Sequence, residues 1–218
     1  MAETYTDTPL LTERFDRALH YATRHHARQL RKGTPVPYTA HLLAVASLVL
    51  EMHGDEDEAI GGLLHDVVED GGGSQALQEI TEQFGKPVAD IVLANSDSVD
   101  EGQPKGDWWD RKKAYVNAMT HKSPPALRVS LADKLHNARS ILIDYRTHGD
   151  DVWARFKQGQ GLATRVYYRE LAQAFERERA RMGEYAGPAI DELRRTVDAI
   201  TALAETHQGP DSRALFSE

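Results

Sequence analysis

The segment GGLLHDVVED, residues 61–70, gathers four ionisable side chains at the end of an otherwise apolar stretch. His65 and Asp66 are adjacent, and Glu69 and Asp70 follow each of them by four residues. On an α-helix, residues four apart lie on one face with their Cβ atoms about 6 Å apart. Three carboxylates held so close repel one another, and a nearby cation would remove that cost. The segment is therefore a candidate cation site, although a solvated helix end with one histidine would give the same pattern.

Two further segments place ligand-type side chains on apolar helix faces. His41 lies in PYTAHLLAVA and Asp133 in VSLADKLHNARSIL, with Asn137 four residues later on the same face. A lone histidine is more often a hydrogen-bonded core residue, but an aspartate on an apolar face is seldom buried without a partner or a metal. With His65 and Asp66, these residues form a set that suits a divalent transition metal with open positions for water or phosphate. Manganese, iron and zinc all fit this donor set.

Basic residues recur shortly before His41, at Arg24, Arg28, Arg31 and Lys32. Cations stabilise a helix C-terminus, so a solvated basic face would account for them. A phosphate clamp is the functional alternative, because arginine supplies a bidentate fork and lysine a point charge. Their closeness to a candidate metal ligand favours the clamp.

Apolar residues at helical spacing predict the elements that must position these side chains. The expected helices are residues 10–31, 38–53, 55–70, 74–84, 87–95, 108–120, 125–147, 161–183 and 187–206, with Ser74 as an N-cap and a surface loop over 96–107. Residues 87–95 could be a strand by composition, but no second strand pattern lies near them. The fold class is therefore all-α, a bundle of eight to ten helices. We expect a flexible N-terminus over residues 1–9, a single domain over 10–206 and a frayed tail over 207–218.

Length and composition exclude several classes of protein. The 218 residues are 40% hydrophobic and 28% charged, as in an ordinary globular chain. The absence of cysteine excludes a disulfide framework, a thiolate nucleophile and a cysteine metal site. A net charge of -8 argues against a broad nucleic-acid-binding face. No apolar run approaches the roughly 18 residues of a membrane span, and the N-terminus lacks a signal-peptide pattern. We expect a cytoplasmic protein with neither nucleic acid nor membrane as a partner.

The order His41, His65-Asp66, Asp133 resembles the HD superfamily of metal-dependent phosphohydrolases. The surrounding segments RKGTPVPYTAHLLAVA, LLHDVVED, FGKPVADIV and VSLADKLHNARSIL resemble the hydrolase domain of the Rel/Spo family across residues 10–180. Enzymes of that family remove the 3′-pyrophosphate of guanosine tetra- and pentaphosphate, (p)ppGpp. Longer members add a synthetase domain and regulatory modules, so the resemblance implies a stand-alone small alarmone hydrolase, a type also found in animals.

The resemblance also implies a role for each matching residue. One manganese ion, rather than zinc or iron, would be held by His41, His65, Asp66 and Asp133. The paired acids Glu69 and Asp70 would position and activate the attacking water. Substrate would contact Arg31, Lys32, Asn137 and Tyr168, the last preferred over Tyr167.

One departure and three alternatives qualify this interpretation. Animal relatives carry a lysine near the position of Trp108, and a tryptophan cannot clamp phosphate, so Trp108 and Trp109 are expected in the core or at a rim. The protein could instead be a phosphatase for another nucleotide, such as a 2′-phosphatase acting on NADPH, or a non-catalytic nucleotide sensor. The presence of both Glu69 and Asp70 disfavours a sensor. A purely structural bundle would leave His41 and Asp133 unexplained.

Overall fold

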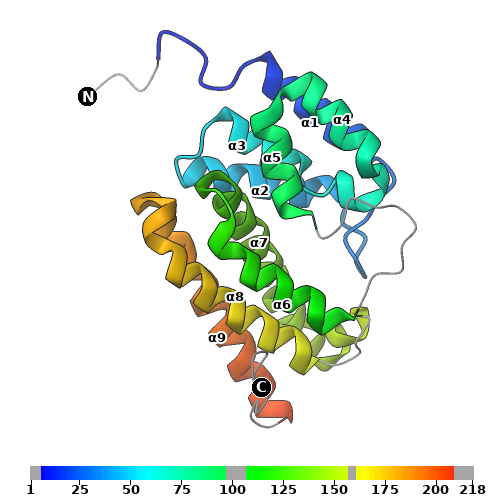
Figure 1. Ribbon diagram of the computed structural model, residues 1–218. Helices are drawn as coiled ribbons and strands as arrows, with labels where there is room; N and C mark the ends of the chain where they lie inside the picture. Colours follow the sequence, from blue (N-terminus) through cyan, green and yellow to red (C-terminus); the bar gives the residue numbers. More distant parts are fainter. Residues whose placement is uncertain (1–5, 97–106, 157–160, 209–218) are drawn as a thin grey trace.

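The computed structural model describes residues 6–96, 107–156 and 161–208. Within these ranges the fold is all-α, as predicted, and the only β-type pairing is a single bridge between Leu30 and Pro37. The α-helices of the described residues are α1 (Glu13–His25), α2 (Thr39–Glu51), α3 (Glu56–Leu64), α4 (Gly73–Phe84), α5 (Lys86–Asn95), α6 (Trp108–Ala118), α7 (Pro124–His148), α8 (Gly161–Met182) and α9 (Gly187–Gln208) (Figure 1).

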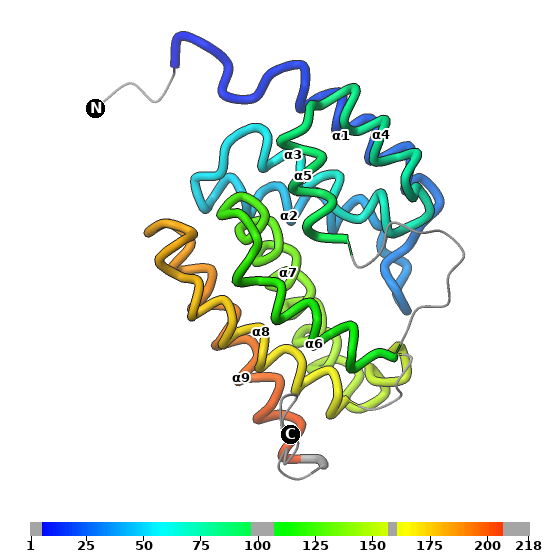
Figure 2. The backbone as a smooth tube through the Cα atoms, in the orientation of Figure 1, coloured from blue at the N-terminus to red at the C-terminus, as the bar shows by residue number. Residues whose placement is uncertain are grey.

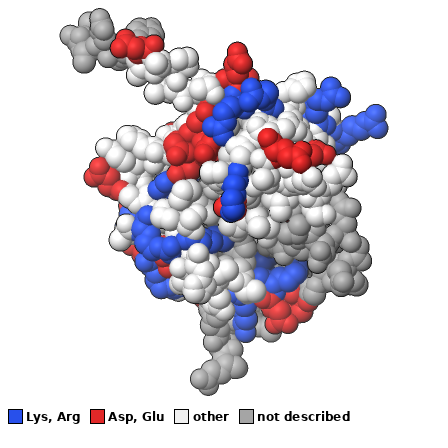
Figure 3. All heavy atoms as spheres, turned by 45° about the horizontal axis from the view of Figure 1, so that its top comes forward, with Lys and Arg blue, Asp and Glu red and all other residues white. Residues whose placement is uncertain are grey.

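Parts of the expected organisation lie outside the described residues. The predicted loop 96–107 is described only at its two ends, the predicted N-terminal segment 1–9 only from residue 6, and the predicted tail 207–218 only to the end of α9. In the ranges that are described, no helix has the length and apolar character needed to cross a bilayer. The face drawn in Figure 3 mixes acidic and basic side chains.

The helices enclose two clusters of buried hydrophobic side chains. One cluster joins α1, α3, α4 and α5 to Leu42 and Ala46 of α2, and the other joins α6, α7, α8 and α9 to Val45, Leu48 and Val49 of α2. α9 packs against both α7 and α8, while α8 also contacts α6 (Figure 2). Helices α2 and α7 contact each other where the two clusters meet. These two helices carry His41 and Asp133, so the boundary between the clusters positions the candidate site.

The first helix is shorter than predicted, because α1 ends at His25 rather than near residue 31. The following residues form a turn-rich loop, in which Arg31 N donates to Val36 O at 2.8 Å and Gly33 adopts a φ of 73°. Glycine reaches that conformation without a steric penalty. Arg31 and Lys32 therefore lie in a loop and not at a helix C-terminus, which removes the helix-cap explanation for this basic pair.

The third helix also ends early, at Leu64 rather than Asp70. His65 and Asp66 lie in the turn that follows, and residues Val68–Gly72 form a short π-helical turn. Gly71 and Gly73 have φ angles of 109° and 49°, so the glycine run lets the chain change direction where other residues would be strained. The predicted Ser74 cap is wrong, since α4 begins one residue earlier, at Gly73, without a side-chain cap.

Candidate active site

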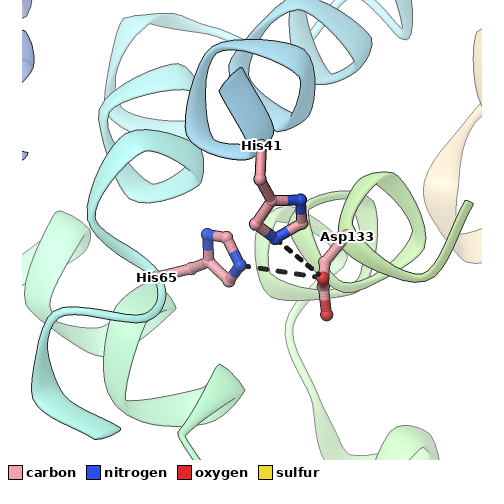
Figure 4. A group of neighbouring side chains, drawn as sticks. All are labelled: His41, His65 and Asp133. Carbon is pink, nitrogen blue, oxygen red and sulfur yellow. Dashed lines mark ion pairs between the residues drawn. The ribbon is translucent and has the colours of Figure 1, made fainter. Parts of the chain in front are cut away.

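Three buried side chains from separate elements converge in the interior of the bundle (Figure 4). His41 comes from α2, His65 from the turn after α3 and Asp133 from α7, and one ligand-type atom of each lies within 4.8 Å of the others. The Nε2 atoms of His41 and His65 lie 3.3 Å and 3.8 Å from Asp133 Oδ1. Both Nε2 atoms are buried, and neither has a hydrogen-bond partner among the residues that the structure describes. Because unsatisfied buried nitrogens are costly and these face a carboxylate, the residues fit a divalent metal ion.

Asp66 adjoins this group. Its Oδ2 lies 3.0 Å from His65 Nε2 and 3.6 Å from His41 Nε2. Tyr38 Oη donates a hydrogen bond of 2.5 Å to the same oxygen. The structure therefore brings together all four residues predicted as metal ligands.

The charges of the group are strongly coupled. Burial lowers the pKa of His65, but the carboxylates of Asp66 and Asp133 outweigh burial and raise that pKa well above its usual range. Burial raises the pKa of Asp66, but the His65 charge holds it well below its usual range. Burial likewise raises the pKa of Asp133, but the neighbouring Lys134 ammonium outweighs burial and holds that pKa well below its usual range. The directions of these pKa shifts favour the ionised form of both carboxylates, which suits a site for a cation.

The other ring nitrogen of each histidine has a defined partner. His65 Nδ1 donates to the backbone oxygen of Gly62 at 2.8 Å. His41 Nδ1 lies 2.8 Å from Nδ1 of His136, a residue of α7. Burial, and after it the neighbouring His41, lowers the pKa of His136 to about 4. Each imidazole is therefore held at Nδ1, which leaves Nε2 directed at Asp133.

Asp133 is held on both sides. Lys134 Nζ lies 2.6 Å from Oδ2, and Asn137 Nδ2 donates to Oδ1 at 2.5 Å. Arg31 Nη2 in turn donates to Asn137 Oδ1 at 2.5 Å, and its guanidinium lies 5.6 Å from the ring centre of Tyr38. Arg31 and Asn137, predicted as substrate contacts, are therefore connected to the metal group through Asp133.

A cavity of about 610 Å³ opens beside this group and reaches His41. Its basic lining residues are Arg31, Lys32, Lys112, Lys134 and Arg155, and its acidic ones are Asp70 and Asp144. Aromatic side chains complete the wall: Tyr38, Trp108, Phe156, Tyr167 and Tyr168. An excess of cations in a chain of net charge -8 attracts anions to the cavity. The combination of cations and rings suits a ligand with phosphates and a planar base.

The two predicted acids occupy different places. Asp70 lines the cavity, where Gln29 Nε2 donates to it at 2.7 Å. Partial desolvation, and after it the charge of Asp66, raises the pKa of Asp70. Glu69 lies in the same π-helical turn but is not among the residues that line the cavity. The prediction that both stack one turn after His65 and Asp66 on one helix is wrong, because α3 has already ended.

The remaining predicted contacts lie on the cavity wall. Lys32 is exposed, with Nζ 5.9 Å from the ring centre of Phe156, and Tyr168 is buried. Trp108 is a partly buried rim residue whose ring lies 5.9 Å from that of Tyr167. Lys112, one turn after Trp108 on α6, brings a cation to this part of the wall.

Several residues of the site were not singled out from the sequence. They are Tyr38, Lys112, Lys134 and His136. Lys134 and His136 follow Asp133 by one and three residues in the segment LADKLHN, so their closeness in sequence to a predicted ligand was a signal that could have identified them. Only the packing of α2 against α7 gives His136 its partner.

The chain matches the family model described as HD domain over residues 18–163. It is 36% identical to the human guanosine-3′,5′-bis(diphosphate) 3′-pyrophosphohydrolase MESH1 over 127 residues, which cover 57% of this chain and 67% of the human protein. It is 35% identical to the GTP pyrophosphokinase of Streptomyces coelicolor over 128 residues, 58% of this chain but only 14% of that much longer protein. A solved structure, described as a metazoan ortholog of SpoT that hydrolyzes ppGpp, is similar with a TM-score of 0.66 and 25% identity, covering 87% of this chain and 97% of that one.

Proposed function

The chain belongs to the HD domain family, and we propose that it removes the 3′-pyrophosphate of (p)ppGpp, giving GDP or GTP and pyrophosphate. The observation that carries the proposal is the pair of buried Nε2 atoms of His41 and His65, which face carboxylates without a hydrogen-bond partner among the described residues, beside a cavity lined by five Lys and Arg side chains. The human relative and the metazoan structure named above support the choice of substrate. We assign the activity to residues 10–206 as one domain.

In this proposal His41, His65, Asp66 and Asp133 hold one manganese ion. A bound divalent ion lowers the pKa of a water molecule and polarises a phosphate. The oxygen and nitrogen donors suit manganese, and the absence of cysteine removes the ligand that most favours zinc. Tyr38 orients Asp66 through its hydrogen bond to Oδ2.

The other residues act on the water and on the phosphates. Asp70 lies at the cavity wall with a raised pKa, which places it to accept a proton from the attacking water. Lys32 and Lys112, which both line the cavity, offset charge on the phosphates. Lys134 combines two tasks, because it is ion-paired with Asp133 and also lines the cavity. Tyr168 contributes a buried ring to the nucleotide-binding surface.

The test is an incubation of the purified protein with ppGpp, with NADPH and with deoxynucleoside monophosphates, each with Mn²⁺ and with EDTA. We expect GDP and pyrophosphate from ppGpp with Mn²⁺ and no product with EDTA. If orthophosphate is released from NADPH while ppGpp stays intact, the substrate is a 2′-phosphorylated dinucleotide and not ppGpp. Tight binding of ppGpp without turnover would identify a sensor.

A further inference from the structure

His41 and His136 form a direct imidazole–imidazole contact between α2 and α7. The two Nδ1 atoms lie 2.8 Å apart, the ring centres are 4.9 Å apart, and the ring planes are tilted by 42°. His41 is 1% exposed, so water does not compete for its Nδ1. This contact lies behind the metal-binding face of His41 and takes no part in the chemistry described above.

The contact fixes where the proton of each ring must lie. A neutral imidazole carries one proton, and a nitrogen that binds a cation must present its lone pair. If His41 presents Nε2 to the metal, its proton lies on Nδ1 and needs an acceptor. Nδ1 of His136 is the hydrogen-bond partner that the described residues supply to it. His136 therefore accepts at Nδ1 and carries its own proton on Nε2.

We propose that His136 is a positioning residue that sets the tautomer and the ring orientation of His41 for metal binding. The proposal rests on the metal-dependent function proposed above. His65 obtains the same support from the backbone oxygen of Gly62, which no side-chain substitution removes. His41 instead depends on one replaceable side chain. Because α7 carries both Asp133 and His136, that helix supplies one ligand and orients another.

Two substitutions at position 136 distinguish the loss of the hydrogen-bond acceptor from the loss of side-chain volume. His136→Asn places its Oδ1 close to the position of Nδ1 and keeps an acceptor, whereas His136→Leu keeps the volume and removes it. Ile143→Ala is the matched control, because Ile143 lies on the same helix and lines the same cavity but is 62% exposed. The readout is the dissociation constant for Mn²⁺ alone, titrated into the metal-free full chain without nucleotide.

We expect His136→Leu to weaken Mn²⁺ binding by about 10–100-fold, as is typical for the outer partners of metal ligands. His136→Asn and Ile143→Ala should stay within a few-fold of the wild type. Unchanged affinity in His136→Leu, with a raised KM for ppGpp, would overturn the proposal and make His136 a substrate contact. Equal weakening in the Asn and Leu variants would overturn it too, since ring packing rather than the acceptor would then matter.

A measurement on the wild type does not depend on the folding of any variant. In the Zn²⁺-loaded protein, the ¹⁵N shifts of His136 should report a protonated Nε2 and an unprotonated Nδ1. A proton on Nδ1 of His136 would overturn the proposal. The metal titrations contain no nucleotide, so the two proposals can fail independently. Absence of ppGpp turnover in the wild type would overturn the proposed substrate. An unchanged affinity of His136→Leu for Mn²⁺ would overturn the proposed role of His136.

Discussion

Asn137 Nδ2 donates a hydrogen bond of 2.5 Å to Asp133 Oδ1, the oxygen that faces the Nε2 atoms of both buried histidines. The amide oxygen of Asn137 accepts in turn from Arg31. Since its NH₂ group is directed at Asp133 and its oxygen at Arg31, the orientation of this side chain is fixed from both ends. The role of Asn137 as a nucleotide contact stays a prediction, but its first effect should be on Asp133.

Replacing Asn137 should therefore weaken metal binding. Asn137→Ala removes the donor that orients Asp133, and loss of such a partner typically reduces metal affinity by about 10–100-fold. Calorimetric titration of Mn²⁺ into the metal-free protein measures the change. Ser140→Ala is the control, because Ser140 also lies on α7 and lines the cavity, but its hydroxyl donates to the backbone oxygen of His136 rather than to a ligand-type side chain. Wild-type affinity with a raised KM would instead assign Asn137 to the substrate.

Arg31 and Lys32 are adjacent but should behave differently. Lys32 is exposed in the loop, so Lys32→Ala should leave the melting temperature nearly unchanged. A charge-assisted hydrogen bond contributes about 1.5–3 kcal/mol, so losing one should reduce kcat/KM for ppGpp by about 10–150-fold, mainly through KM. Arg31→Ala should also weaken Mn²⁺ binding, because Arg31 holds Asn137.

Steady-state kinetics and thermal unfolding on the same samples test this difference. Lys86→Ala is the control, since Lys86 is 77% exposed and pairs with Asp90 on α5, away from the cavity lining. A lower melting temperature with unchanged KM in Lys32→Ala would exclude a phosphate contact at this residue.

Substitutions of the adjacent acids Glu69 and Asp70 should also differ in their effect on activity. Asp70 lines the cavity and Glu69 does not, so Asp70→Asn should lose about 10²–10⁴-fold in kcat while retaining Mn²⁺, as expected for a general base. Glu69→Gln should have the smaller effect. Single-turnover rates with bound metal quantified on each sample provide the measurement. If Glu69→Gln proves the more damaging change, the proton acceptor has been assigned to the wrong carboxylate.

The periodicity of apolar residues was enough to predict where most of the helices lie and that His41 and Asp133 are on apolar helix faces. Such faces must be buried, but periodicity does not identify the helix against which each one packs. The end of α1 could not be predicted, because residues after His25 are held by tertiary contacts: Tyr38 N donates to Gln29 O at 2.9 Å, and His26 stacks on the Tyr38 ring. Helical spacing continues through residue 31 in the sequence, so nothing local opposes a longer helix.

The residues that orient the predicted metal ligands could not be predicted for a related reason. His136 obtains its role from a partner 95 residues earlier in the chain, and Asn137 from Arg31, 106 residues earlier. Spacing along a helix identifies which residues share a face, but not which atom of a distant residue meets them. The π-helical turn after Val67 likewise depends on three consecutive glycines whose flexibility permits several paths.

His26 should make the stability of the fold depend on pH. Its side chain is 2% exposed, its Nδ1 lies 2.6 Å from Gln29 Oε1, and its ring centre lies 4.9 Å from that of Tyr38. Burial lowers the pKa of His26 below the unfolded value of about 6.5. Between the two pKa values the unfolded chain binds more protons than the folded one, so the free energy of unfolding rises with pH there. Its contribution is fully present above about pH 6.5 and is lost as the pH falls toward the folded value.

Urea unfolding at pH 5, 6 and 7, with EDTA to exclude metal, measures this dependence. We expect His26→Gln to be less stable than the wild type at pH 7, because buried packing is lost, but to lose less stability on acidification. One titrating group changes the free energy of unfolding by at most about 1.4 kcal/mol per pH unit, which bounds the difference in slope. His20→Gln is the control, since His20 is exposed on α1 and should keep the wild-type slope. If His26→Gln also keeps that slope, the acid sensitivity of the fold arises elsewhere, and the loop carrying Arg31 and Lys32 is not anchored through a neutral His26.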